Sequence, residues 1–373
     1  MRISTWAVAA ASLAIIGSSG GVAVAYPGPV PAHRPVVHRG LDSGNGNLRV
    51  MTYNADEGTD YIEVSQAQTQ QQFLVAVGQT ITQVRATNPP ARMQAIASQI
   101  LAARPNLVGL EEMDQWYTGS FDPQSQTCGQ VSLEFDMLAE LMAALAAQGG
   151  HYSAIVQAQQ FAFPPVPGII PPSTFLCVSV VNTNVVLVRT DINPKTFSYG
   201  NPQSGQFVNR VFLQTPIGTI PIPRAWESVD GSFHGVPFRF LSTHLEANDP
   251  NVRELQGGEL RTGPANVSVP VVIAMDSNAQ AAPMPQDPTY IDFLNAGYSD
   301  VWSQLEPQVP GLTCCQAQFD NNAVSQLSQR IDLVLTHGPV FAKSIGLFGA
   351  NPGDFSNGLW PSDHAGVAAE IKL

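Results

Sequence analysis

The feature of this sequence that most constrains its fold is a series of short apolar segments, each of which ends or begins at a polar residue suited to chemistry. The apolar segments show the alternation or the continuous hydrophobic run that is typical of β-strands. The polar residues at their ends are Asn54, Glu112, His244, Asp276 with Asn278, Asp332, and Asp363 with His364. Because a sheet fixes the backbone while the adjoining loops expose side chains, we expect these residues to meet in one site.

Amphipathic helices are predicted between these strands. Residues 90–103 follow a proline and carry one apolar stripe, and residues 133–147 and 249–260 show similar patterns. Residues 56–88 predict a partly helical excursion over one face of the domain, and the proline-rich residues 161–172 predict a loop. The strands themselves are expected at residues 48–54, 107–110, 152–156, 182–188, 236–245, 269–274, 330–336, 341–347 and 367–371. This mixture indicates an α/β fold with two packed sheets covered by helices.

The N-terminal residues resemble a targeting signal rather than part of a fold. Residues 1–25 combine a positive start, an apolar core too short to span a bilayer and a small-x-small cleavage site at Ala23-Val24-Ala25. Residues 26–47 form a Pro/Gly-rich lead-in, so the folded domain is expected at 48–373. No later run of 18 apolar residues predicts a transmembrane segment. We therefore expect cleavage near Ala25 and a secreted, extracellular protein.

The four cysteines suit an oxidising compartment, in which an even number favours disulfides. Cys314 and Cys315 are adjacent. They either bridge each other while Cys128 pairs with Cys177, or each reaches one distant partner, and the sequence leaves both alternatives open. A zinc site is a poor interpretation because no C-x-x-C spacing occurs.

The charge of the chain limits its partners. Lys and Arg number 17 against 29 Asp and Glu, which gives a formal net charge of −12. Such a protein does not attract polyanions over its whole surface, although it can still bind a phosphate locally. Gly-rich phosphate loops, the G-x-S-x-G elbow and the H-E-x-x-H zinc motif do not occur, which argues against those enzyme classes.

Six motifs together resemble a known family. V-M-T-Y-N, L-V-G-L-E-E, S-T-H-L, M-D-S-N, R-I-D-L-V and S-D-H-A-G-V occur in this order. They are similar to the endonuclease/exonuclease/phosphatase superfamily, which includes exonuclease III, deoxyribonuclease I, bacterial sphingomyelinases and inositol-polyphosphate 5-phosphatases. The resemblance runs from residue 48 to residue 373. It implies a four-layered α/β/β/α sandwich, similar to deoxyribonuclease I, in which two mixed sheets are flanked by helices.

The resemblance also implies a metal site. Glu112 corresponds to the principal Mg²⁺ ligand, with Mn²⁺ or Ca²⁺ as alternatives, and Asn54 lies close to the metal and the phosphate. Asp363 is a further group that can touch the metal. The family usually has Gln-Glu where this chain has Glu111-Glu112, so either acid could bind the metal and the second is favoured.

The catalytic groups follow from the same comparison of motifs. His364 corresponds to the general base that activates water, and Asp332 orients it. Asp276 and Asn278 position the nucleophile and the phosphate. His244 assists the leaving oxygen or binds the phosphate.

The resulting expectation is a secreted, metal-dependent phosphoesterase that hydrolyses a phosphodiester or phosphomonoester with a water activated by metal and histidine. A secreted endonuclease and a sphingomyelinase- or phospholipase C-like hydrolase are narrower alternatives, so the substrate is a nucleic acid, a phospholipid or an inositol phosphate. A non-catalytic secreted binding protein is the alternative from another class. The sequence does not indicate an oligomeric state.

Overall fold

The computed structural model describes residues 46–373. The expected signal peptide and the lead-in up to residue 45 lie outside the described residues. The first strand begins at Leu48, as its alternation predicts.

The larger sheet has eight strands. Its order is β15 (Phe341–Phe348), β16 (Gly366–Lys372), β1 (Leu48–Asn54), β2 (Leu107–Glu111), β6 (Thr174–Arg189), β3 (Gln115–Asp122) and β4 (Thr127–Asp136), and β5 (Tyr152–Ile170) also pairs with β6. Strands β1 and β2 are parallel, with Asn54 opposite Glu111. The polar ends of these two central strands therefore lie at the same edge.

The second sheet has six strands. Its order is β13 (Ser299–Asp300), β14 (Asp332–His337), β12 (Val271–Asp276), β11 (Val236–Thr243), β10 (Ala225–Phe233) and β7 (Phe197–Gln206). Strands β11 and β12 are parallel, and β12 pairs with β14 so that Asp276 lies opposite Asp332. A separate hairpin is formed by β8 (Val211–Thr215) and β9 (Gly218–Ile222).

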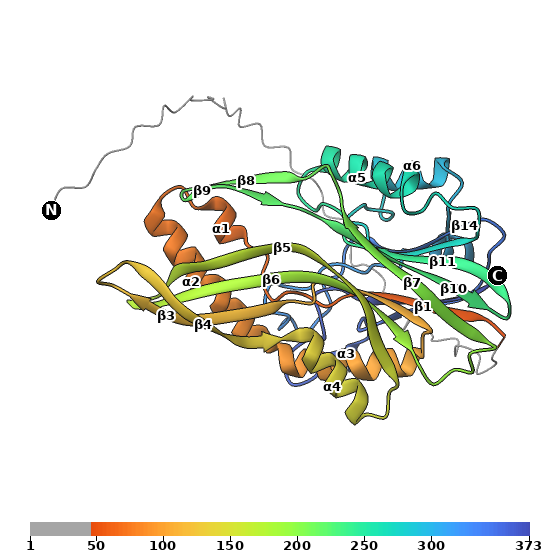
Figure 1. The fold of residues 1–373 in the computed structure, drawn as a ribbon, viewed down its shortest axis with the longest axis horizontal. Helices are drawn as coiled ribbons and strands as arrows, with labels where there is room; N and C mark the ends of the chain where they lie inside the picture. Colours follow the sequence, from red (N-terminus) through yellow and green to blue (C-terminus); the bar gives the residue numbers. More distant parts are fainter. Residues whose placement is uncertain (1–45) are drawn as a thin grey trace. The chain divides into compact units, whose positions relative to one another are not determined.

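Alternation along the strands assigns each face to a layer. In β1, Val50 belongs to the core between the two sheets, whereas Met51 belongs to the core under the helices. Helices α3 (Pro89–Ala103) and α4 (Met137–Ala147) cover the outer face of the larger sheet. Helices α5 (Pro250–Thr262) and α6 (Pro288–Asn295) cover the second sheet (Figure 1). These four layers confirm the predicted α/β/β/α sandwich.

The proline-rich segment at residues 161–172 was wrongly predicted as a loop, because most of it belongs to the long strand β5. Strand β5 pairs only with β6, and its register shifts between Phe163 and Val166, on either side of two prolines. Proline lacks the N–H that a second neighbouring strand would need, so an edge strand with a bulge tolerates it.

The predicted helix at 133–147 begins four residues later. Asp136 caps α4 by accepting a hydrogen bond from the Ala139 amide, and the residues before it belong to β4. Strands β3, β4 and β7 to β10 carry no clean alternation and were not predicted. The described chain also contains helix α7 (Val301–Leu305) and a short 3₁₀ turn, η1 (Pro352–Asp354).

The excursion after β1 folds into α1 (Ile62–Gln66) and α2 (Gln70–Thr87). A capping box between Thr69 and Gln72 begins α2 by satisfying two backbone amides. The helix packs against β5, and a Cβ at Gly78 would collide with the Ile169 carbonyl. The backbones of α2 and β5 are therefore in close contact.

Both disulfides follow the first of the two pairings considered from the sequence. Cys128 of β4 pairs with Cys177 of β6, with their Cα atoms 5.7 Å apart, and Cys314 pairs with Cys315. Among the described residues, no helix has the length and apolarity needed to cross a membrane.

Candidate active site

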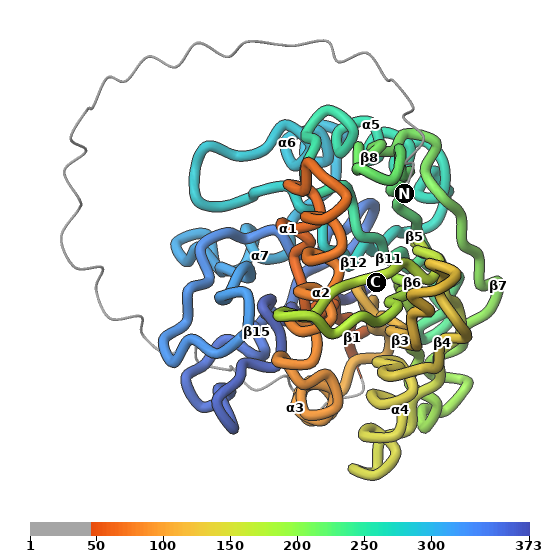
Figure 2. Tube along the Cα trace, turned by 90° about the vertical axis from the view of Figure 1, so that its left-hand side faces the viewer, coloured from red at the N-terminus to blue at the C-terminus, as the bar shows by residue number. Residues whose placement is uncertain are grey.

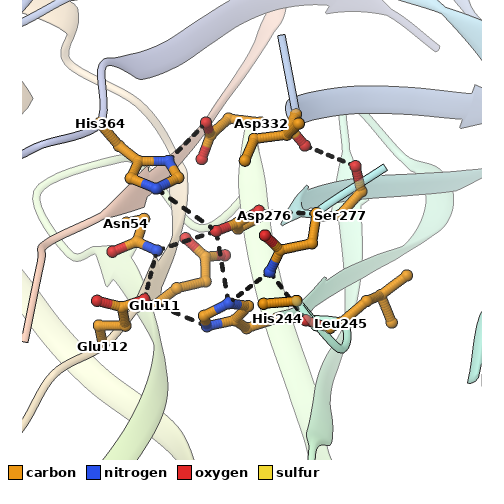
Figure 3. A network of polar contacts seen from close by, with 12 residues as sticks. Asn54, Glu111, Glu112, His244, Leu245, Asp276, Ser277, Asp332 and His364 are labelled. Carbon is orange, nitrogen blue, oxygen red and sulfur yellow. Dashed lines mark hydrogen bonds and ion pairs between the residues drawn. The ribbon is translucent and has the colours of Figure 1, made fainter. Parts of the chain in front are cut away.

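The polar residues at the strand ends converge, as Figure 3 shows. They come from both sheets, because the two parallel pairs β1–β2 and β11–β12 end at neighbouring edges. A bridge between His244 and Asp276 continues the β11–β12 pairing beyond the strands. The residues brought together are Asn54, Glu112, His244, Asp276, Asn278, Asp332 and His364.

Asn54 connects the carboxylates of the two sheets. Its Nδ2 donates to Oε1 of Glu112 at 2.8 Å and to Oδ2 of Asp276 at 2.9 Å. Its Oδ1 accepts from the backbone amide of Asp56 at 2.9 Å, which is consistent with this assignment of the amide. Asn54 therefore orients two carboxylates, and its own oxygen is already used by the loop.

Glu111 and Glu112 have different environments. Glu111 is buried, and its Oε1 accepts from the hydroxyls of Thr52 at 3.0 Å and Ser242 at 3.1 Å. Burial, together with the nearby Asp276 carboxylate, raises its pKa well above the usual range. Glu112 has a positive φ of 59°, which directs its side chain into a cavity of about 930 Å³. Of the two acids, Glu112 is the one available to a ligand.

His364 is held in a fixed orientation. Its Nδ1 lies 2.8 Å from Oδ2 of Asp332, which is itself buried. Its backbone amide donates to the Ser362 hydroxyl at 3.0 Å, and that hydroxyl donates to the Asn54 carbonyl. The second ring nitrogen, Nε2, therefore points toward Oδ2 of Asp276, 3.9 Å away.

Negative charge dominates the electrostatics around His364. Burial alone would lower the pKa of His364, but Asp332, Asp363 and Asp276 together raise it well above its usual range. Burial raises the pKa of Asp332 to about 6 and that of Asp363 to about 8. The nearest oxygen of Asp363 is 3.9 Å from His364 Nε2. The negative charges of these carboxylates repel one another, and a bound cation would reduce the repulsion.

His244 is electrostatically different from His364. Its Nε2 lies 2.9 Å from Nδ2 of Asn278 and 3.5 Å from Oδ2 of Asp276. Its Nδ1 lies 3.3 Å from Nη1 of Arg224. Burial and the Arg224 charge lower its pKa to about 3. At neutral pH His244 is uncharged, so it can donate one hydrogen bond but carries no extra proton to release.

The donor set suits a divalent cation. Glu112, His244 and Asp276 offer ligand atoms that all lie within 4.8 Å of one another, and Asp276, Asp332 and His364 form a second such group. Oδ1 of Asp332 is buried without a hydrogen-bond partner. The carboxylate oxygens of these groups are ligands that suit Mg²⁺, Mn²⁺ or Ca²⁺.

Several residues of this cavity were not predicted as site residues from the sequence, among them Arg224 and Cys315. Arg224 follows β9, and its contact with His244 depends on strands that carry no clear pattern. Cys315 also lines the cavity, with Sγ 4.0 Å from Nε2 of His364. Nothing in the spacing of either residue indicated that it would lie near the predicted base.

Solved structures with a similar fold cover most of the chain. A protein from Beutenbergia cavernae described as endonuclease/exonuclease/phosphatase is 21% identical, with a TM-score of 0.53, and the match covers 88% of this chain and 72% of that one. TDP2 from D. rerio complexed with a single-strand DNA product has 16% identity and a TM-score of 0.51, covering 89% and 100%. A mannosyl-6-phosphatase from Bacteroides thetaiotaomicron has 15% identity and a TM-score of 0.50, covering 87% and 100%.

No protein family defined by sequence matches the chain, and neither does any curated protein. The structural matches nevertheless extend over most of the chain. Their sequence identities are low, so they establish the fold and nothing further. The order of the six motifs predicted the same fold. Residues 46–373 therefore have the fold of the endonuclease/exonuclease/phosphatase superfamily.

Proposed function

We propose that this protein is a secreted phosphoesterase that requires a divalent cation and uses His364 to deprotonate the attacking water. The observation that carries the proposal is the geometry of His364. Its Nδ1 is paired with Asp332, and its Nε2 faces Asp276 in the cavity that Glu112 also lines. Secretion is proposed from the pattern of residues 1–25.

The chemistry of a phosphoester explains why this set of side chains is needed. The phosphate is anionic and repels nucleophiles, so its hydrolysis needs positive charge, a base for the water and support for the departing oxygen. The carboxylates of Glu112 and Asp276 would hold the cation, for which Mg²⁺ is the first candidate and Mn²⁺ or Ca²⁺ the alternatives. Such an ion supplies charge neutralisation at the phosphate oxygens.

His364 has the geometry of a general base. A bound cation would offset the carboxylate charges that raise the pKa of His364 and so favour the neutral ring. The hydrogen bond from Nδ1 to Asp332 then fixes the tautomer and leaves the Nε2 lone pair free to accept a proton from water. Asp332 then stabilises the imidazolium that forms. His244 is uncharged, so in this mechanism it binds a phosphate or leaving oxygen through its N–H, and the proton acquired by His364 is the one available to the leaving group.

Two asparagines keep the reacting groups in place. Asn54 bridges Glu112 and Asp276, and the backbone amide of Asn278 donates to Oδ1 of Asp276 at 2.9 Å. Nδ2 of Asn278 also donates to the Leu245 carbonyl at 3.0 Å. The Asn54 side chain and the Asn278 backbone amide therefore restrict the positions of the carboxylates, as a preorganised site requires, and the Asn278 side chain contacts His244.

A screen of the purified protein with Mg²⁺, Mn²⁺ or Ca²⁺ tests the proposal. The substrates are plasmid DNA, sphingomyelin and bis(p-nitrophenyl) phosphate, each with and without EDTA. His364→Ala should abolish hydrolysis, and His337→Ala, at an exposed histidine outside the cavity, is the matched control. Hydrolysis by His364→Ala at the wild-type rate would reject His364 as the base, and hydrolysis of no substrate by either protein would favour a non-catalytic binding protein.

A further inference from the structure

The cavity that contains the polar centre is much larger than a phosphate needs. Its volume is about 930 Å³, near the top of the range of roughly 300–1,000 Å³ for small-molecule sites. Beyond the polar centre its walls come from α1, α2, β5, β6 and the β8–β9 hairpin. Figures 1 and 2 show these elements gathered in one region, where α1 contacts β8 and α2 contacts β5.

This part of the cavity, which we call the apolar chamber, is lined by hydrophobic side chains. Its main lining residues are Phe73, Val77, Phe161, Val178, Leu213 and Ile222. Most of them belong to a hydrophobic cluster separate from the cores between and outside the sheets. Apolar cavities exclude water and bind apolar molecules, so the lining favours an apolar occupant.

The chamber is preformed. Gly78 of α2 and Gly168 of β5 bring the two backbones into direct contact, because a Cβ at either position would collide with the opposite element. The helix therefore cannot move closer to the strand. The space that Phe73 and Val77 line lies beside this close contact between helix and strand.

The charges that line the cavity argue against a polyanion. Arg224 is the one arginine or lysine among the lining residues, and it lies 3.6 Å from the Glu246 carboxylate and 3.3 Å from His244. Nucleic-acid grooves follow the phosphate backbone with several cationic side chains. A ligand with one phosphate and an apolar body fits this cavity better than a nucleic-acid strand.

The apolar lining continues to the protein surface. Ile62 of α1 and Ile217 at the turn of the β8–β9 hairpin both line the cavity and are 47% and 51% exposed. Phe212, on the outer side of the same hairpin, is 58% exposed. Exposed apolar residues around an apolar entrance are a feature of surfaces that contact a membrane, another protein or an apolar ligand.

We propose that the substrate is a phospholipid whose hydrocarbon chain occupies the apolar chamber while its phosphodiester lies at the polar centre. This inference rests on the proposed phosphoesterase function. Hydrolysis would bond the water oxygen to phosphorus, break one ester P–O bond and transfer a water proton to the departing alkoxide, which yields an alcohol and a phosphomonoester.

A chain-length series provides the test. The probes are p-nitrophenyl alkyl phosphodiesters with methyl to decyl chains, assayed with Mg²⁺ below their micellar concentrations. Each buried methylene should raise kcat/KM up to about fourfold until the chamber is filled. Phosphatidylcholine vesicles should also be hydrolysed. A kcat/KM that does not change with chain length would overturn the inference. A kcat/KM that rises with chain length, with no hydrolysis of the vesicles, would overturn the proposal that the enzyme acts on a lipid surface.

Two neighbouring residues of β8 give a matched pair of variants. Leu213 lines the chamber, whereas the side chain of Phe212 points to solvent on the opposite side of the strand. Leu213→Asn should flatten the chain-length series, so that kcat/KM for the decyl ester falls at least tenfold relative to kcat/KM for the methyl ester. Phe212→Asn should keep the slope for monomeric substrates. Equal slopes for the two variants would contradict the assignment.

A binding measurement separates this inference from the proposed function. Calorimetric titration with methyl to decyl phosphonates reports on the chamber without hydrolysis. Binding that strengthens with chain length, in a protein that hydrolyses no diester, would overturn the phosphoesterase proposal alone. Hydrolysis of every diester at the same rate, with phosphonate binding independent of chain length, would overturn the chamber assignment alone.

Discussion

Replacing Asp332 by asparagine tests the centre of the proposed mechanism. The carboxylate lies 2.8 Å from Nδ1 of His364, and both side chains are buried. The asparagine side chain would keep the shape but lose the charge, and its amide could donate to Nδ1 and stabilise the wrong tautomer. The variant therefore removes the interaction that stabilises the imidazolium as it forms.

The size of the effect follows from that interaction. A hydrogen bond to a charged group contributes roughly 1.5–3 kcal/mol. If it is realised in the transition state, its loss lowers kcat about 10- to 150-fold, since each 1.36 kcal/mol is tenfold. Burial lowers the pKa of His364, and Asp332 is the strongest of the groups that raise it. Without that carboxylate the pKa falls, so the acidic limb of the kcat/KM profile should move to lower pH.

The assay is the initial rate of bis(p-nitrophenyl) phosphate hydrolysis between pH 5 and 9. It compares wild type, Asp332→Asn, His364→Ala and the double variant. Because Asp332 acts through His364, the double variant should be no slower than His364→Ala alone. Asp300→Asn, which removes a buried partner of Arg330 away from the cavity, controls for destabilisation. Additive losses, or an acidic limb that does not move, would refute the reasoning.

Three further predictions concern the metal site, pH and the disulfide. Glu112→Gln should weaken Mg²⁺ binding by about 100-fold or more in calorimetry, since even outer-shell changes cost about 10–100-fold. Glu111→Gln should bind Mg²⁺ normally, because Glu111 is buried and does not line the cavity. Equal losses in the two variants would contradict this. In EDTA the melting temperature should fall as pH rises from about 6.5 to 8, because burial raises the pKa of Asp363 to about 8. The folded protein then holds a proton that the unfolded chain has released, so stability decreases with pH, and Mg²⁺ should reduce the decrease; a flat EDTA profile would count against it. Cys128→Ser with Cys177→Ser opens a bridge of sequence separation 49 and should lower the free energy of unfolding by about 4 kcal/mol in urea titration, with unchanged kcat.

The central strands could be predicted because their signals are local. Alternation in β1 and the apolar run of β12 set the strand type, and their terminal residues, Asn54 and Asp276, were recognised as site candidates from position alone. Burial, which the sequence does not report, distinguishes the two acids: Glu111 is buried, whereas Glu112 lines the cavity. Burial raises the pKa of Glu111, which favours its neutral form, and the hydroxyls of Thr52 and Ser242 donate to its Oε1.

The apolar chamber could not be predicted, because its walls depend on pairings between distant segments. Strand β5 contains prolines, so its pattern indicates a loop, and only its pairing with β6 makes it a strand. The β8–β9 hairpin has no helix or core pattern that would place Leu213 beside α1. Long-range contacts of this kind override local propensity, and composition gives no sign of them.

The two halves of the cavity have separate structural origins, and this separation has a functional consequence. The polar centre is built on the ends of central strands, whose positions are fixed by ladders on both sides. The chamber is built from α1 and α2, which interrupt the chain between β1 and β2, and from β5 and the β8–β9 hairpin at the periphery. Substitutions in the chamber should therefore change which diester is preferred while the pH profile set by His364 and Asp332 stays the same. A Leu213→Asn enzyme with an altered pH profile would show that the halves are coupled.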